Sequence, residues 1–188
     1  RELLTRSYET ATEWIVITGA PCSGKTTVLK KLGEHGIRWI PEMARVYIES
    51  RRDQGLDISQ IRENESEFQR IIIDKKLSLE RRTPSEKTIF FDRGVPDSIT
   101  YYRVSGIDPN EALRQCFHFR YKTIFLLDRL PLEIDYARIE NDNSSIFIQE
   151  WIEKDYKSLG YNVIHVPVMP VEKRADLILS HIKAKGGP

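Results

Sequence analysis

Cysteine is scarce in this sequence of 188 residues, which contains only Cys22 and Cys116. Two cysteines provide neither a disulfide framework nor a zinc site, and their scarcity fits a reducing compartment. Long apolar runs are absent too, since the longest, such as residues 124–127, are far too short to span a bilayer. Residues 1–12 lack the apolar core of a signal peptide. We therefore expect a cytoplasmic protein without a membrane span.

The sequence also lacks an excess of charge of either sign. Its 29 lysines and arginines are balanced by 28 aspartates and glutamates, which gives a net charge of +1. Because nucleic-acid binding requires basic side chains to neutralise phosphates, this balance gives no reason to expect a nucleic-acid partner. The length favours a single domain over residues 1–188, with its core at about residues 13–183. The oligomeric state cannot be read from the composition.

Short apolar, β-branched runs alternate with longer stretches of helical pattern, and no internal repeat interrupts them. The predicted strands are residues 14–18, 37–40, 88–91, 123–127 and 161–166. All but 37–40 are continuously apolar, as strands buried on both faces of a parallel sheet must be. The predicted helices are residues 25–34, 42–52, 59–82, 96–104, 109–120, 144–159 and 171–185. This alternation predicts an α/β fold with a doubly wound, five-stranded parallel sheet.

The first predicted strand runs into a phosphate-binding loop of the form G-x-x-x-x-G-K-T. Glycines at both ends allow the backbone to approach phosphate oxygens closely, and the loop N–H groups converge on them at the start of a helix. Lys25 places an ammonium at the β- and γ-phosphates, and the Thr26 hydroxyl is a ligand for Mg²⁺. We expect ATP and Mg²⁺ to bind here, on Gly19, Ala20, Pro21, Cys22, Ser23, Gly24, Lys25, Thr26 and Thr27.

Two further acids follow predicted strands, at the edge of the sheet where ligands bind in such folds. Asp92 ends the run 88–91 and is a candidate second ligand for Mg²⁺, and Arg93 beside it could contact phosphate oxygens. Glu42 follows the strand that Pro41 stops, where a carboxylate could accept the proton of an attacking hydroxyl. For Asp92 and Arg93, the alternative is a surface turn in which the two side chains pair. For Glu42, the alternative is a residue of the first helical turn that is only stabilised by the helix dipole.

A polar stretch at about residues 129–143 is a candidate mobile lid. Arg138 lies inside this stretch and could close over the donor phosphates, with Arg129 as a second candidate. The alternative is a solvated surface segment. Tyr101, Tyr102 and Arg103 could line an acceptor pocket, although aromatic side chains with this spacing are more often part of a core.

The order of these motifs resembles the predicted AAA-type P-loop ATPase/kinase family, which is related to the ribosylnicotinamide-kinase domain of NadR. The resemblance rests on the phosphate loop, Ile-Pro-Glu-Met-Ala-Arg at 40–45, Phe-Asp-Arg-Gly-Val-Pro-Asp-Ser at 91–98, and Val-Ile-His-Val-Pro at 163–167. A more distant similarity to deoxynucleoside kinases implies Glu42 as general base, Asp92 and Arg93 on metal and phosphates, and Arg138 from the lid. Gly94 stands where those kinases carry a serine.

These patterns favour a small-molecule kinase that transfers the γ-phosphate of ATP to a hydroxyl, with a nucleoside-like acceptor. The alternative is a regulatory ATPase or GTPase switch with a protein or lipid partner, which would need the loop and Asp92 but no acceptor pocket near Glu42. ATP is favoured over GTP because the sequence has no Asn-Lys-x-Asp motif for guanine.

Overall fold

The structure is a computed structural model that describes the backbone of residues 7–130 and 139–185. Its centre is a five-stranded sheet in the order β3-β4-β2-β6-β7, in which all pairs of neighbouring strands are parallel. The strands are β2 (Ile15–Thr18), β3 (Trp39–Ile40), β4 (Phe90–Asp92), β6 (Thr123–Leu127) and β7 (Val163–Val166). This confirms the α/β fold with a parallel sheet, although most strands are shorter than the sequence predicts.

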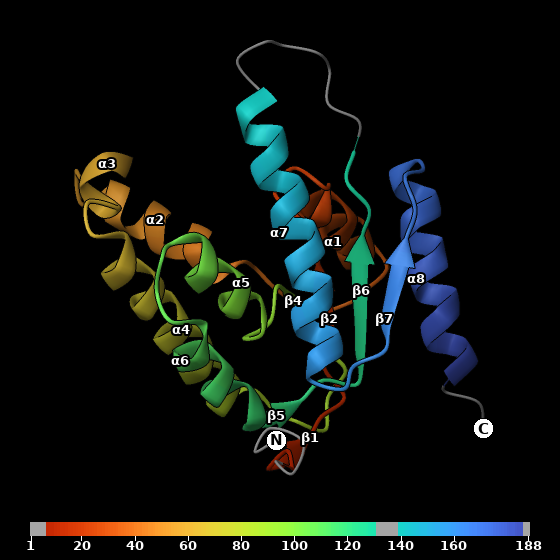
Figure 1. The fold of residues 1–188 in the computed structure, drawn as a ribbon. Helices are drawn as coiled ribbons and strands as arrows, with labels where there is room; N and C mark the ends of the chain where they lie inside the picture. The colour runs from red at the N-terminus through yellow and green to blue at the C-terminus, as the bar shows by residue number, and fades with distance from the viewer. Residues whose placement is uncertain (1–6, 131–138, 186–188) are drawn as a thin grey trace.

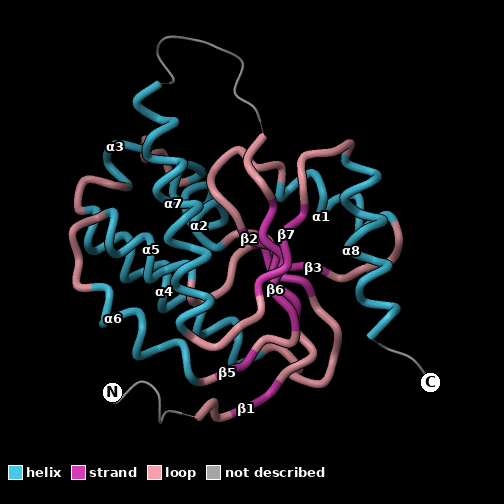
Figure 2. The backbone as a smooth tube through the Cα atoms, turned by 45° about the vertical axis from the view of Figure 1, so that its right-hand side comes forward, coloured by secondary structure: helices cyan, strands magenta, loops and turns pink. Residues whose placement is uncertain are grey.

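Helices cover both faces of the sheet, as Figures 1 and 2 show. On one face α1 (Lys25–Glu34) and α8 (Val171–Lys185) pack over Ile15 and Ile17. On the other, α4 (Glu65–Arg82), α5 (Asp97–Val104) and α7 (Ile139–Ser158) pack over Trp14 and Val16. Successive side chains of a strand point to opposite faces, so the apolar run at 14–17 supplies both cores at once.

The predicted helix at 59–82 is wrong as a single element. The structure divides it into α3 (Ile58–Ile61) and α4, with a turn between them. Asp57 caps α3, and its side chain and that of Gln60 form a capping box. Asn64 starts the next helix by accepting a hydrogen bond from the N–H of Glu67 at 3.0 Å. Two capping residues within one amphipathic pattern therefore explain the break.

The predicted helix at 109–120 is also wrong in its second half. It holds only as α6 (Pro109–Leu113), which is followed by a 3₁₀ turn at Arg114–Phe117 and by β5 (Phe119–Arg120). Strand β5 pairs with β1 (Thr10–Ala11) in a small second sheet that the sequence analysis missed. The remaining helix, α2 (Met43–Asp53), begins one residue after the predicted start. Among the described residues, no helix is long and apolar enough to cross a membrane.

Register places the predicted site residues along one edge of the sheet. Ile17 of β2 lies opposite Asp92 of β4 and opposite Phe125 of β6. The carboxyl ends of these three central strands are therefore level. Gly19, Arg93 and Asp128, which follow these strands, start the loops at this edge, where ligands of open α/β sheets bind.

Candidate functional site

The segment between β2 and α1 adopts backbone conformations that few residues tolerate. Gly19 has φ +143°, and a Cβ there would lie 2.8 Å from the carbonyl oxygen of Leu127. Gly24 has φ +86° and directly precedes α1. Cys22 also has a positive φ, of 61°, so the loop bends sharply between its two glycines. The backbone therefore needs glycine at both ends of the motif.

The Lys25 ammonium lies within this loop. Its Nζ donates hydrogen bonds to the carbonyl oxygens of Gly19 and Ala20, at 3.0 and 2.8 Å, and to Ser23 Oγ at 3.3 Å. Burial and the neighbouring Arg93 lower the pKa of Lys25 to about 7, although Asp92 and Glu42 act in the opposite direction. An anion placed against this ammonium would restore its charged form.

Nucleotide binding should therefore take up a proton. With a pKa of about 7, Lys25 is mostly neutral at pH 8.5 before binding, and the polyphosphate should raise that pKa again. Affinity should then be greatest below pH 7 and fall as the pH rises through 7. Calorimetric titration with AMP-PNP·Mg²⁺ at pH 8.5, in buffers of different ionisation enthalpy, should show uptake of about one proton.

The Lys25→Arg variant is the matched control for this titration, because a guanidinium stays charged over the whole range. Any binding of AMP-PNP·Mg²⁺ that this variant retains should therefore take up no proton at position 25. Wild-type binding without proton uptake would contradict the lowered pKa of Lys25 or its contact with the polyphosphate, and the Lys25→Ala variant distinguishes the two.

Thr26 and Asp92 come together at the start of α1 and the end of β4. The Thr26 hydroxyl donates to Asp92 Oδ2 at 3.3 Å. The other carboxylate oxygen, Oδ1, is buried and has no hydrogen-bond partner within residues 7–130 and 139–185. Burial raises the pKa of Asp92 despite the opposing charges of Lys25 and Arg93. A buried carboxylate oxygen without a partner, next to a hydroxyl, fits Mg²⁺, which usually takes one or two carboxylates and keeps several waters.

Arg93 is held at the centre of the site. Its backbone has φ +68°, an uncommon conformation for a residue other than glycine. Its Nε donates to Glu42 Oε1 at 3.0 Å, and its Nη1 donates to the Gly19 carbonyl oxygen at 2.9 Å and to Asp97 Oδ1 at 3.2 Å. The guanidinium thus connects the phosphate loop with Glu42.

Asp97 anchors this arrangement and was missed by the sequence analysis. It is fully buried and accepts hydrogen bonds from the Gly94 N–H at 2.9 Å, from the Tyr156 hydroxyl at 2.6 Å and from the Thr18 hydroxyl. The available signal was its spacing of four residues from Arg93, which places an acid and a base within reach of each other at a helix start.

Glu42 precedes the first residue of α2, and its side chain caps no N–H of that helix. It contacts Arg93 instead. Burial acts to raise the pKa of Glu42, but the charges of Arg93, Lys25 and Lys76 together outweigh burial and hold the pKa below its usual value. The side chain is therefore a carboxylate at neutral pH, able to accept a hydrogen bond from a hydroxyl.

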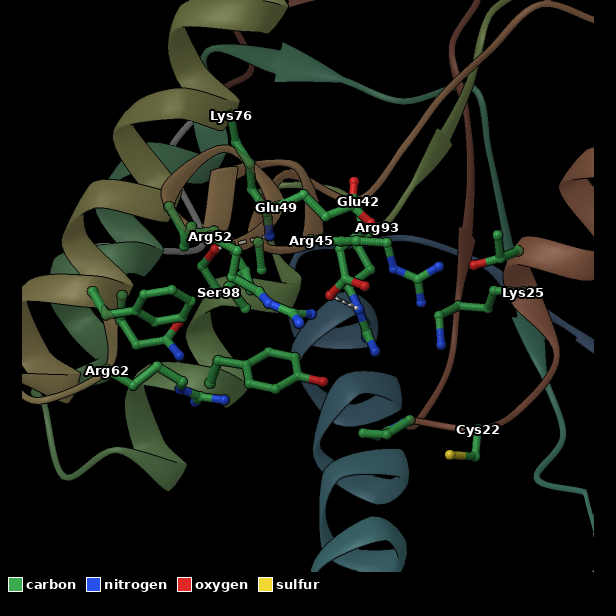
Figure 3. Close-up of a pocket in the computed structure, with 18 of the residues that line it drawn as sticks. Cys22, Lys25, Glu42, Arg45, Glu49, Arg52, Arg62, Lys76, Arg93 and Ser98 are labelled. Atoms are coloured by element: carbon green, nitrogen blue, oxygen red, sulfur yellow. Dashed lines mark hydrogen bonds and ion pairs between the residues drawn. The ribbon is translucent and has the colours of Figure 1, made fainter. Parts of the chain in front are cut away.

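A pocket of about 630 Å³ extends from the phosphate loop past Glu42 (Figure 3). Its far walls come from α2, α4 and α5, through side chains that include Ile48, Phe68, Ile72, Ser98 and Tyr101. Tyr101 lines this pocket, and its predicted contact with an acceptor stays a prediction. Tyr102 is instead a buried core residue, and Arg103 pairs with Asp155 at 2.8 Å.

Lys76 lines this pocket and, like Asp97, was not predicted from the sequence. It is buried, and its Nζ donates to the Gly94 carbonyl oxygen at 3.0 Å and to Ser98 Oγ at 3.1 Å. It occurs as one of many basic residues in a helical stretch, and only the packing of α4 against α5 distinguishes it.

Two side chains from distant parts of the chain hold the phosphate loop in place. Gln149 of α7 accepts from the Ala20 N–H at 2.7 Å and donates to the Leu127 carbonyl oxygen at 3.1 Å. Arg174 of α8 donates to the carbonyl oxygens of Ser23 at 2.6 Å, Asp128 at 2.9 Å and Pro167 at 2.9 Å. Neither residue belongs to a motif, so these contacts could not be predicted from motif spacing.

Residues 131–138 of the predicted lid lie outside the described residues, and residues 139–143 form the first part of α7. Arg138 lies outside the described residues. Arg129 is described, and its Nε donates to Ser145 Oγ of α7 at 3.3 Å. The role of residues 129–143 as a lid therefore stays a prediction.

The parallel sheet and the glycine-bounded loop around Lys25 define the class: this is a P-loop fold of the nucleotide-kinase type. The sequence profile of the AAA domain family matches residues 14–174, and the chain belongs to that family. No curated protein matches the sequence significantly.

Several solved structures share the fold. NadR in complex with NAD and AMP-PNP superimposes with a TM-score of 0.69 at 14% identity, over 92% of this chain and 50% of the NadR chain. Deoxyadenosine kinase from M. mycoides gives 0.63 at 15% identity, over 91% and 99% of the two chains. Shikimate kinase from Aquifex aeolicus gives 0.54 at 22% identity, over 93% and 99%. At such identities the likeness shows the fold alone.

Proposed function

We propose that this chain is a small-molecule kinase that binds ATP with Mg²⁺ on residues 19–27 and phosphorylates a hydroxyl of a nucleoside-like acceptor. The observation that supports it best is the contact between Glu42 and Arg93. This pair places a carboxylate in a pocket that is continuous with the phosphate loop. A hydrolytic switch would need the loop and Asp92 but not such a pocket, so the pocket favours transfer over hydrolysis.

The side chains of the candidate site would have separate roles in phosphoryl transfer. Lys25 and the loop N–H groups would hold the β- and γ-phosphates, and Thr26 and Asp92 would hold Mg²⁺. The bound metal ion would neutralise charge on the phosphate oxygens. Arg93 would stabilise the charge that spreads over the transferring phosphoryl group. Glu42 would orient the acceptor hydroxyl and take its proton as the new O–P bond forms, while the bond from the γ-phosphorus to the bridging oxygen breaks and ADP leaves. The lowered pKa makes Glu42 a weak base, which suffices because phosphoryl transfer relies mainly on positioning.

Two structural neighbours support a nucleoside-like acceptor, because they are described as complexes of deoxyadenosine kinase with dCMP and of NadR with NR. The resemblance read from the sequence points the same way. A cytoplasmic location, a single P-loop domain and a role for Arg138 remain predictions of this proposal.

A screen with ATP·Mg²⁺ tests the proposal. Nucleosides, vitamins and nucleotides would be assayed for thermal stabilisation and for phosphoryl transfer. We expect at least one to be phosphorylated. Slow ATP hydrolysis that no acceptor changes, together with a nucleotide-dependent protein partner, would instead support the regulatory alternative.

Asp92→Asn should lower transfer in this assay by about 100- to 1,000-fold, because it removes a charged ligand of the metal ion. The ligand-free variant should unfold at the same temperature as the wild type or higher. Burial raises the pKa of Asp92, so at a pH above that pKa the ionised carboxylate destabilises the folded state. Asparagine carries no charge and does not have this cost.

Asp176→Asn on the exposed side of α8 is the matched control and should leave both quantities unchanged. If Asp92→Asn kept Mg²⁺-dependent transfer at the wild-type rate, the metal ion would have to bind elsewhere.

A further inference from the structure

The lining of the pocket contains more basic side chains than phosphoryl transfer requires. Among the described residues, its lining contains six basic residues, Lys25, Arg45, Arg52, Arg62, Lys76 and Arg93, and two acids, Glu42 and Glu49. Lys25 and Arg93 are placed to meet the donor phosphates, and Lys76 is engaged by Gly94 and Ser98. Glu42 pairs with Arg93. Three of the described arginines, Arg45, Arg52 and Arg62, therefore remain on the acceptor side, and Glu49 is the one other acid that the described residues contribute to the lining.

Arg52 and Arg62 lie at the end of the pocket away from the phosphate loop. Arg52 follows Glu42 by ten residues along α2, which corresponds to about 15 Å of helix. Arg62 comes at the end of α3, on the same side of the molecule. In Figure 3, Lys25 and Cys22 lie at one side of the pocket and Arg62 at the other, with Arg52 nearer to Arg62. The two arginines thus lie at the end of the pocket opposite the loop that would hold the donor phosphates.

The guanidinium groups at this end are available to a ligand. Arg52 is exposed, and its side chain makes no hydrogen bond or ion pair with another described residue. Arg62 donates from Nε and Nη2 to the Glu65 carboxylate, at 2.9 and 2.6 Å, and lies 4.9 Å from the ring centre of Phe68. These contacts fix its orientation and, among the described residues, leave Nη1 without a partner.

The pocket between the two ends is largely apolar. Phe68 and Ile72 of α4 are buried, and Ile48 of α2 lines the same space. An acceptor that reaches from Glu42 to Arg52 would place its body against these side chains. A neutral compound could use the apolar walls but would leave Arg52 and the Nη1 donor of Arg62 unused.

We propose that the acceptor carries an anionic group, a phosphomonoester or a carboxylate, that binds Arg52 and Arg62 while its hydroxyl lies at Glu42. This inference rests on the proposed kinase function for the position of the hydroxyl. Guanidinium groups bind phosphates and carboxylates through paired N–H donors, and an Arg held by a neighbouring acid and an aromatic ring loses little freedom on binding.

Calorimetric binding of charged and neutral partners tests the proposal independently of catalysis. The protein is first saturated with AMP-PNP·Mg²⁺, so that the phosphate loop is filled. Ribose 5-phosphate is then compared with ribose, and gluconate with glucose, which separates phosphate from carboxylate. We expect one anionic member to bind at least about 10-fold more tightly than its neutral counterpart, and its affinity to fall with added salt.

Arg52→Gln and Arg62→Gln should each weaken this binding by about 10-fold, as expected for the loss of a charge-assisted contact. Their affinity for AMP-PNP should not change. Arg51→Gln is the matched control, because it removes the same charge from the same turn of α2, where Arg51 contacts Gln54 and does not line the pocket. Circular dichroism would verify that each variant is folded.

The outcomes separate this inference from the kinase proposal. Equal binding of charged and neutral partners, or anion binding that survives both substitutions, would overturn the anionic acceptor even if a neutral nucleoside proved to be phosphorylated. Binding that depends on Arg52 and Arg62, without transfer to any acceptor, would retain the anion site and count against the kinase. If AMP-PNP itself did not bind, the same comparison of charged and neutral partners without nucleotide would still show whether Arg52 and Arg62 bind an anion.

Discussion

Replacing Lys25 with alanine should abolish phosphoryl transfer and weaken ATP binding by at least about 100-fold. A charge-assisted hydrogen bond of an ammonium to phosphate contributes about 1.5–3 kcal/mol, and Lys25 would make several. The substitution also removes the donor that holds the carbonyl oxygens of Gly19 and Ala20, so the loop loses its internal support. A calorimetric titration with AMP-PNP·Mg²⁺ measures the binding, and a transfer assay with the acceptor from the screen measures the activity.

Lys30→Ala provides the matched control for this experiment. It removes the same charge from the same helix, but Lys30 is exposed and lies outside the pocket. Its affinity for nucleotide should equal that of the wild type. Unchanged ATP affinity in Lys25→Ala would mean that the loop does not hold the polyphosphate, and the proposed site would be wrong.

Glu42→Gln should lower the transfer rate by about 100- to 10,000-fold, which is the usual contribution of a general base. Affinity for ATP should stay within about twofold, since Glu42 faces the acceptor side of the site and would not contact the nucleotide. Glutamine keeps the shape and one oxygen that can accept from Arg93 Nε, so the guanidinium should stay in place. Steady-state kinetics should therefore show a loss in kcat, while calorimetry shows unchanged ATP binding.

Asp53→Asn at the exposed end of the same helix is the control for the loss of one negative charge from α2 and should have no effect on either quantity. Full activity of Glu42→Gln toward an identified acceptor would refute the role of Glu42 as base. The kinase proposal would then require another group to orient the hydroxyl.

The parallel sheet was predictable because its strands are apolar on both faces, which few other structures permit. The run at 123–127 is an example, since all of its residues are buried and both bounds agree with the prediction. Helix ends were harder to predict where capping residues lie inside an amphipathic pattern. Asp57 and Asn64 each take part in such a cap, and only their backbone conformations identify them as starts of separate helices.

The candidate site was predictable where its residues follow strands. Thr26, Asp92, Arg93 and Glu42 come together because parallel strands end at one edge of the sheet. Asp97, Lys76, Gln149 and Arg174 were not predicted, since their roles depend on contacts between segments far apart in sequence. Gln149, for example, reaches a backbone N–H that precedes it by 129 positions. Periodicity and motif spacing carry no information on such pairs.

Arg174 has a practical consequence for anyone who prepares shorter versions of this protein. Arg174 is only 2% exposed, and its guanidinium donates a hydrogen bond to the carbonyl oxygen of Ser23. It belongs to α8, which begins at Val171. A fragment that stops after β7 would retain the whole G-x-x-x-x-G-K-T motif but would lose the hydrogen bond from Arg174 that holds this loop. The smallest unit worth expressing therefore extends to the end of α8.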